Sequence, residues 1–395
     1  YMIISHPALF NGPNNTNPVE DYRQYRSSVA GGAHNARVYL IDEIIDQFGF
    51  GIKMNPAGLR NFLRFAKHHY ITTPKHVFII GRGMQYIHHR NYESNPDISR
   101  VNFVPPFGYP ASDALLTAEP GSSLPEIPIG RLSVINGTEV AVYLKKVKEY
   151  EQNQATASQS IADKAWMKNI VHIVGASEPG LEGLLSQYLD IYGDIIADTL
   201  FGANVTKFSK SGTSTIEQLN SNKLSKLFKD GISMITYFGH SSSTTLEYNL
   251  DNPENYDNFT KYPVFLGLGC NAGNFFNFST VRLQVKETLS ERYVLAPDRG
   301  TIAFVASTHF GIVHYLDIWA SRAYKNMSSK AYGKTLGEIM METAQDVFNY
   351  TTQDDFYARC NTEESELHGD PAIVMNPHPK PDYVIEAPMT AVMRP

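Results

Sequence analysis

Short apolar runs of strand length alternate with helical patterns along almost the whole chain, and this alternation limits the possible folds more than any other feature. Strands separated by helices are typical of βαβ units, in which parallel strands form a sheet and the helices cover its faces. The predicted strands occupy residues 2–5, 36–41, 75–81, 127–131, 170–175, 204–208, 232–238, 263–268 and 300–306. The sequence therefore predicts an α/β protein with mostly parallel sheets flanked by helices.

Helical periodicity is clearest in residues 56–69, where Pro56 suits the first turn and Leu59, Phe62 and Leu63 lie on one apolar face. Further helices are predicted at residues 139–150, 184–199, 215–228, 312–326 and 336–349. Because each predicted helix follows or precedes a strand, the pattern predicts two consecutive α/β units.

The length of 395 residues is sufficient for two to three domains. A polar stretch at residues 151–162 is the best candidate boundary between the two units. We therefore expect an N-terminal α/β subdomain over residues 1–157 and a second one over residues 158–376. Residues 377–395 are rich in proline and then strand-like, as at the start of a further β module.

Composition excludes several classes of protein. The formal charge of −6 provides no basic stripe for nucleic acid, and no run of about 18 apolar residues suggests a transmembrane helix. Only two cysteines occur, Cys270 and Cys360, so a disulfide framework and a four-cysteine zinc site are excluded. The sequence has no HExxH motif, and we predict no catalytic metal and no cofactor for catalysis.

Two of the buried strands end in residues that suit thiol chemistry. The run 232–238 leads into Gly239 and His240, and the run 263–268 leads into Gly269 and Cys270. Because parallel strands end at one edge of a sheet, neighbouring strands would place the imidazole beside the thiol. A thiol nucleophile needs a base to form its thiolate, and the same imidazole then protonates the leaving amine.

Glycines flank both candidates and let the backbone approach a substrate closely. The N–H groups of Ser241 and Cys270 are candidates for an oxyanion hole. Taken singly, His240 is also consistent with a structural histidine and Cys270 with a small core residue. A serine hydrolase that uses Ser241 is a further alternative.

The motifs together resemble the gingipain family of cysteine peptidases, in the clan of caspases and legumains, a family that includes the sortase of the type IX secretion system. The similar segments are residues 128–131, 237–241, 269–276, 300–308 and 369–372, which occur in the family's order within residues 37–374. The resemblance implies two caspase-like subdomains followed by an immunoglobulin-like module, here truncated. It also implies that His240 and Cys270 form the dyad.

By the same resemblance, Glu178 is the third catalytic residue, a carboxylate that orients the imidazole; the alternative is a solvated loop carboxylate. The sequence departs from the family at Ser241, where glycine is usual. It also lacks the Asp with which the arginine-specific members bind the substrate's guanidinium.

The residues expected to line the substrate pocket are all apolar, and they are Phe238, Leu268, Val313 and Leu184. An apolar pocket would leave a basic side chain unpaired, which is costly. We therefore expect the enzyme not to prefer Arg or Lys at the cleavage position.

The resemblance also sets expectations about partners and location. It implies a protein or peptide substrate, a secreted or bacterial cell-surface protein, and secretion-system components as partners if the chain is a sortase. It allows a structural calcium ion, for which Asp251, Glu254 and Asp257 are candidate ligands, although solvated surface carboxylates are the favoured interpretation. A cysteine endopeptidase is the favoured function. The alternatives are a transpeptidating sortase with the same dyad and a catalytically silent cell-surface scaffold or binding module.

Overall fold

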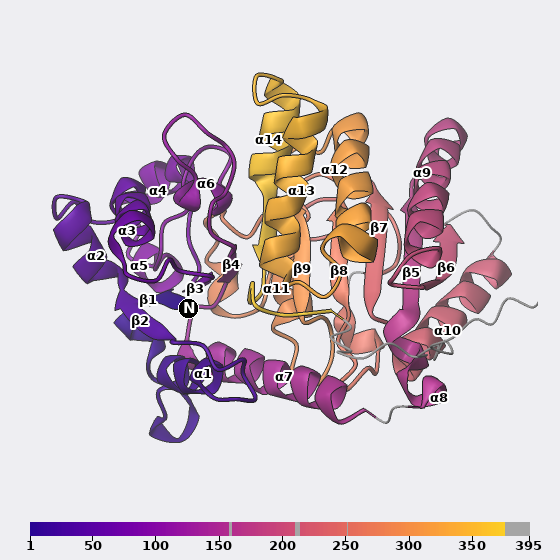
Figure 1. Cartoon of the computed structure of the whole chain (residues 1–395), viewed down its shortest axis with the longest axis horizontal. Helices are drawn as coiled ribbons and strands as arrows, with labels where there is room; N and C mark the ends of the chain where they lie inside the picture. The colour runs from indigo at the N-terminus through magenta and orange to yellow at the C-terminus, as the bar shows by residue number, and fades with distance from the viewer. Residues whose placement is uncertain (158–159, 210–213, 251, 376–395) are drawn as a thin grey trace, which may run out of the picture.

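One ten-stranded sheet forms the centre of the computed structural model, which describes residues 1–157, 160–209, 214–250 and 252–375 (Figure 1). The strands are β1 (Met2–Ser5), β2 (Arg37–Leu40), β3 (Val77–Ile80), β4 (Ile129–Leu132), β5 (Asn169–Gly175), β6 (Asn204–Ser209), β7 (Met234–Gly239), β8 (Val264–Leu268), β9 (Ala303–Ser307) and β10 (Ser365–His368). Their order is β2-β1-β3-β4-β10-β9-β8-β7-β5-β6. Neighbouring strands are parallel, apart from the antiparallel pair of β10 and β9.

Helices cover the sheet and its ends. They are α1 (Pro18–Ser27), α2 (Ile41–Phe48), α3 (Pro56–His69), α4 (Tyr86–Tyr92), α5 (Ile98–Val101), α6 (Ala114–Thr117), α7 (Gly137–Thr156), α8 (Ile161–Lys164), α9 (Pro179–Ala197), α10 (Ser214–Asp230), α11 (Leu289–Val294), α12 (Val313–Lys325), α13 (Leu336–Tyr350) and α14 (Phe356–Glu364). Figure 1 shows α12, α13 and α14 in front of the central strands and α7 along the lower edge of the molecule. In the described part of the chain, every helix is too short or too polar to span a bilayer.

The predicted mostly parallel α/β fold is confirmed, and each of the nine predicted strands is present. Two features differ from the expectation. Strand β10 was not predicted, and helix α7 continues to Thr156, into the polar stretch expected to separate two units. Strands β1–β4 and β5–β10 join in one sheet across that stretch, so the division at residues 157 and 158 stays a prediction. The β module predicted at residues 377–395 lies outside the described residues.

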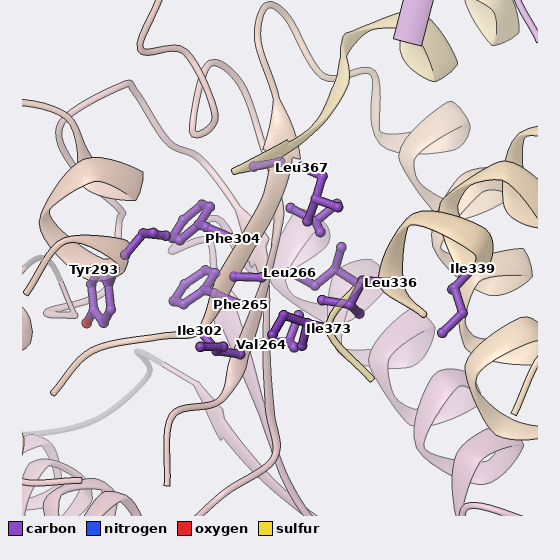
Figure 2. Close-up of a cluster of buried hydrophobic side chains, with 14 of the residues drawn as sticks. Val264, Phe265, Leu266, Tyr293, Ile302, Phe304, Leu336, Ile339, Leu367 and Ile373 are labelled. Atoms are coloured by element: carbon purple, nitrogen blue, oxygen red, sulfur yellow. The ribbon is translucent and has the colours of Figure 1, made fainter. Parts of the chain in front are cut away.

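The core lies on both faces of the central strands, as Figure 2 shows. Phe265 of β8 and Phe304 of β9 stack with ring centroids 4.4 Å apart, and Tyr293 of α11 packs against both rings. Leu266 lies on the opposite face, toward Leu336 of α13. Successive side chains of a strand point to opposite faces, so a run that is apolar at every position is buried on both sides. Burial on both faces holds the central strands in place, and the candidate site lies at the ends of these strands.

Candidate active site

The loops after β5, β7 and β8 lie side by side, because these strands are neighbours in the order β8-β7-β5. The register pairs Gly175 with Gly239 and Phe238 with Leu268. His240 follows β7 directly, and Cys270 is the second residue after β8. The structure therefore brings His240 and Cys270 to adjacent strand ends at one edge of the sheet.

Glycines are required here because the strand ends approach each other closely. A Cβ on Gly239 would lie 2.1 Å from the carbonyl oxygen of Gly175, and one on Gly269 would lie 2.3 Å from Oγ of Ser241. Real Cβ atoms do not approach other atoms this closely, so any other residue would push the loops apart. The N–H of His240 donates to the Gly175 carbonyl at 2.8 Å, which ties the two loops together.

The Cys270 thiol is partly exposed and contacts the backbone of Gly311, in the loop after β9. The Gly311 N–H donates to Sγ at 3.4 Å, and the thiol donates to the Gly311 carbonyl oxygen at 3.7 Å. The second thiol, Cys360 in α14, has a different environment. Burial, followed by the nearby Glu364 and Glu363, raises its pKa. The two thiols therefore lie in different surroundings.

Glu178 reaches the histidine from the neighbouring loop. It precedes Pro179, the first residue of α9, and its Oε2 lies 3.7 Å from Nε2 of His240. Both side chains are more than half exposed, at 65% for Glu178 and 56% for His240. An exposed pair at this distance is a weak interaction.

Glu247 is a functional candidate that the sequence did not reveal. One carboxylate oxygen of Glu247 lies within 4.8 Å of ligand atoms of both Glu178 and His240. Its N–H donates to the His240 carbonyl at 3.0 Å. No sequence signal marks it, because it lies in a polar loop without a repeated motif.

The predicted oxyanion donors, the N–H groups of Ser241 and Cys270, lie just after β7 and β8. Among the described residues, neither the Ser241 N–H nor the Cys270 N–H donates to another group. The Ser241 hydroxyl, by contrast, donates to the carbonyl oxygen of Cys270 at 2.8 Å. A carbonyl is no base for a serine nucleophile, so this arrangement does not favour a serine hydrolase.

The four predicted pocket residues differ in exposure. Phe238 and Leu268 are 1% and 2% exposed and belong to the core, where Phe238 stacks on Tyr188. Leu184 in α9 is exposed, and Val313 at the start of α12 is half-buried. Of these four residues, Leu184 and Val313 are the two with appreciable exposure.

Metal binding has one candidate among the described residues, the set of Glu178, His240 and Glu247. Exposed acidic groups commonly gather in this way without an ion, so we do not assign the set as a metal site. Of the three carboxylates predicted as calcium ligands, Asp251 lies outside the described residues, and Glu254 forms an exposed ion pair with Arg299 at 3.4 Å. Calcium binding stays a prediction.

Comparisons with known proteins agree with this arrangement. The sequence profile of Peptidase family C25 matches residues 1–376. The fold is similar to the Arg-specific cysteine proteinase gingipain R (RGPB), with a TM-score of 0.66, 15% identity, and coverage of 95% of this chain and 78% of that one. It is also similar to the complex of Porphyromonas gingivalis RgpB pro- and mature domains (TM-score 0.65, 15% identity, coverage 95% and 79%).

A third solved structure, described as a protease, has a TM-score of 0.66 at 14% identity and covers 95% of this chain and 78% of that one. No curated protein matches the sequence. At these identities the solved structures establish the caspase-like fold, and the profile, which spans nearly the whole chain, establishes the family. The chain belongs to Peptidase family C25, and it is a gingipain-like cysteine peptidase.

Proposed function

We propose that the chain is a cysteine endopeptidase in which Cys270 is the nucleophile and His240 is the acid–base partner. The observation that carries this proposal is the parallel register of β7 and β8, because it brings His240 and Cys270 to adjacent strand ends. The Gly311 N–H at the sulfur and the carboxylate of Glu178 near the imidazole support the same roles.

The reaction proceeds in two halves through a thioester. The Cys270 thiolate attacks the peptide carbonyl carbon, and the N–H groups of Ser241 and Cys270 stabilise the resulting oxyanion. The His240 imidazolium gives its proton to the leaving amine, and the C–N bond breaks. Neutral His240 then takes a proton from water, the hydroxide attacks the thioester, and the acid leaves as the thiolate is restored. No cofactor enters either half.

The substrate is a protein or peptide, and we propose that its residue at the cleavage position is not Arg or Lys. The exposed part of the predicted pocket, Leu184 and Val313, carries no charge to pair with a basic side chain. The aromatic ring of Phe310 and the side chain of Ile312, both exposed, flank the glycine that contacts the thiol. We also propose a secreted or cell-surface location, which rests on the family resemblance.

Alkylation by iodoacetamide at pH 6 tests the dyad without a known substrate. A free thiol is only about 0.3% ionised there, and an activated one is mostly ionised but intrinsically less nucleophilic, which leaves a net gain of about tenfold. We expect Cys270 to react about tenfold faster than Cys360 in peptide mass mapping, and His240→Ala to abolish the difference. Equal and slow labelling of both cysteines in the wild type would contradict the proposal and favour a silent scaffold.

Hydrolysis and transpeptidation share the same thioester, so the products distinguish them. The active protein is incubated with a peptide that it cleaves and with an added amine. If the chain is a hydrolase, the N-terminal fragment of the peptide is released as the free acid. An amide of the added amine as the main product would instead identify a sortase.

A further inference from the structure

We propose that Glu247 is a second positioning carboxylate for His240, so that two carboxylates from two loops hold the imidazole. Glu178 approaches from the start of α9, and Glu247 approaches from the loop after β7. This inference rests on the proposed function, because it gives His240 the acid–base role.

The backbone of Glu247 is fixed relative to the histidine. Its N–H donates to the carbonyl of His240 at 3.0 Å and to the hydroxyl of Tyr237 at 2.9 Å. The Tyr237 hydroxyl in turn donates a short hydrogen bond to the same His240 carbonyl. Tyr237 is completely buried in β7, so its hydroxyl holds the Glu247 N–H and the His240 carbonyl at fixed positions. The loop from His240 to Glu247 therefore returns to the histidine at a defined position.

The side chain of Glu247 is also held in place. The Ser177 hydroxyl donates a short hydrogen bond to Oε1 of Glu247, and Ser177 directly precedes Glu178. One hydroxyl therefore links the loop that carries one carboxylate to the side chain that carries the other. Glu247 is partly buried, whereas Glu178 is 65% exposed. Of the two carboxylates, Glu247 is the better fixed.

Glu178 alone is a weak partner for the imidazole. Its 3.7 Å separation from His240 exceeds the roughly 2.7–2.9 Å of a charge-assisted hydrogen bond. A second carboxylate within 4.8 Å adds negative potential near the ring. Two carboxylates near the ring can orient it and stabilise the positive charge that it carries when it takes up a proton during the reaction. Because Nε2 faces Glu178, the other ring nitrogen remains for the thiol.

The groups that face His240 from neighbouring elements define what a pH profile reports. They are Glu178 before α9, Glu247 in the histidine's own loop and Cys270 after β8. His309, in the loop after β9, accepts from the Asn271 N–H through its carbonyl, and burial lowers the pKa of its ring. This lowered pKa favours the neutral form of the ring, which adds no charge beside the two carboxylates.

The test compares the pH dependence of Cys270 alkylation in Glu247→Gln, Glu178→Gln and the double variant. Glutamine keeps the size and the ability to accept from Ser177, so only the charge is removed. We expect each single variant to be alkylated about two- to fivefold more slowly on the acid side of the profile, the range expected for one partly exposed charge. The midpoint of the profile should move to higher pH. The double variant should show the larger shift.

Three further variants separate positioning from general effects. Glu93→Gln makes the same charge change in an exposed ion pair with Arg90 and should leave the profile unchanged. Ser177→Ala should give a smaller shift in the same direction, and Glu247→Asp should recover part of the wild-type rate. With a peptide substrate, Glu247→Gln should lower kcat and leave KM nearly unchanged.

A Glu247→Gln profile that coincides with wild type, while Glu178→Gln shifts, would overturn the inference and leave the dyad intact. If His240→Ala also leaves the profile unchanged, the proposed function fails as well. The same experiment therefore distinguishes the two failures.

Discussion

Glu364 lies beneath the active-site loops as a buried carboxyl group whose ionisation should control stability. It is the last residue of α14, and its Oε2 accepts from the Ser307 hydroxyl at 3.0 Å. Ser307 also accepts the Gly273 N–H through its carbonyl at 2.9 Å, so Glu364 belongs to the support of the cysteine loop. Burial raises the pKa of Glu364 from 4.5 to about 7, against the opposing effect of the Ser307 hydrogen bond.

The sign of the stability effect follows from proton binding. Between these two pKa values the folded protein holds a proton that the unfolded chain releases. The stabilisation is therefore complete below about pH 4.5 and is lost as the pH rises through about 7. The full difference of about 2.5 pKa units, from 4.5 to about 7, corresponds to about 3 kcal/mol, of which about 2.5 kcal/mol is lost between pH 5 and pH 8.

Urea unfolding of Glu364→Gln at pH 5 and pH 8 measures this loss. Glutamine still accepts from Ser307 but cannot ionise, so the variant should gain about 2.5 kcal/mol over wild type between the two pH values. The exposed Glu43→Gln serves as the control and should follow wild type. Parallel pH dependences for Glu364→Gln and wild type would show that the carboxyl is already ionised in the folded state, and the reasoning would fail.

Three other substitutions test the site and its support. Gly269→Ala should abolish the fast alkylation of Cys270, because the new Cβ would lie 2.3 Å from Oγ of Ser241, while the far-UV circular dichroism stays native. Alkylation at the wild-type rate would show that the loops tolerate the added atom. Ser241→Ala should keep the fast alkylation of Cys270 and lower the free energy of unfolding in urea by only about 1 kcal/mol, since it removes one hydrogen bond. Loss of the thiol's reactivity would instead give the Ser241 hydroxyl a catalytic role. Arg131→Met should destabilise the protein by about 3–5 kcal/mol in urea unfolding, because it leaves Asp113 buried without its bidentate partner at 2.6 Å; an unchanged midpoint would contradict this.

The fold was predictable where burial is expressed as uninterrupted apolar sequence. Residues 232–238 and 263–268 are apolar along most of their length, and both form central strands that are buried on each face. Strand β10 was not predictable in this way, because Glu366 and His368 are fully buried within it. Each depends on a specific partner: Glu366 accepts the Asp113 N–H at 3.1 Å, and His368 accepts the Ser133 N–H at 3.1 Å. Burial raises the pKa of Glu366 and lowers that of His368 to about 3, so both favour the neutral form.

The active site was predictable from strand ends only in part, because strand order is a property of the whole sheet. His240 and Cys270 follow strands that are consecutive in sequence and adjacent in space. Glu178 follows β5, and β6 intervenes between β5 and β7 in the sequence. If β6 also lay between them in the sheet, two strand spacings of about 4.8 Å would separate the Glu178 and His240 loops by about 10 Å. The edge position of β6 removes this gap.

The same reasoning explains why Glu247 was missed and Glu178 was found only by resemblance. Both carboxylates reach the imidazole through contacts between loops: the His240 N–H bonds to Gly175, and the Ser177 hydroxyl bonds to Glu247. Neither contact leaves a periodic pattern in the sequence, since each depends on which strand is the neighbour of β7. The proposed nucleophile and base can therefore be predicted from strand ends, whereas the carboxylates proposed to act on them depend on the order of the strands. Substitutions in the loop after β5 should for this reason alter the reactivity of Cys270, although that loop lies more than 90 residues earlier in the chain.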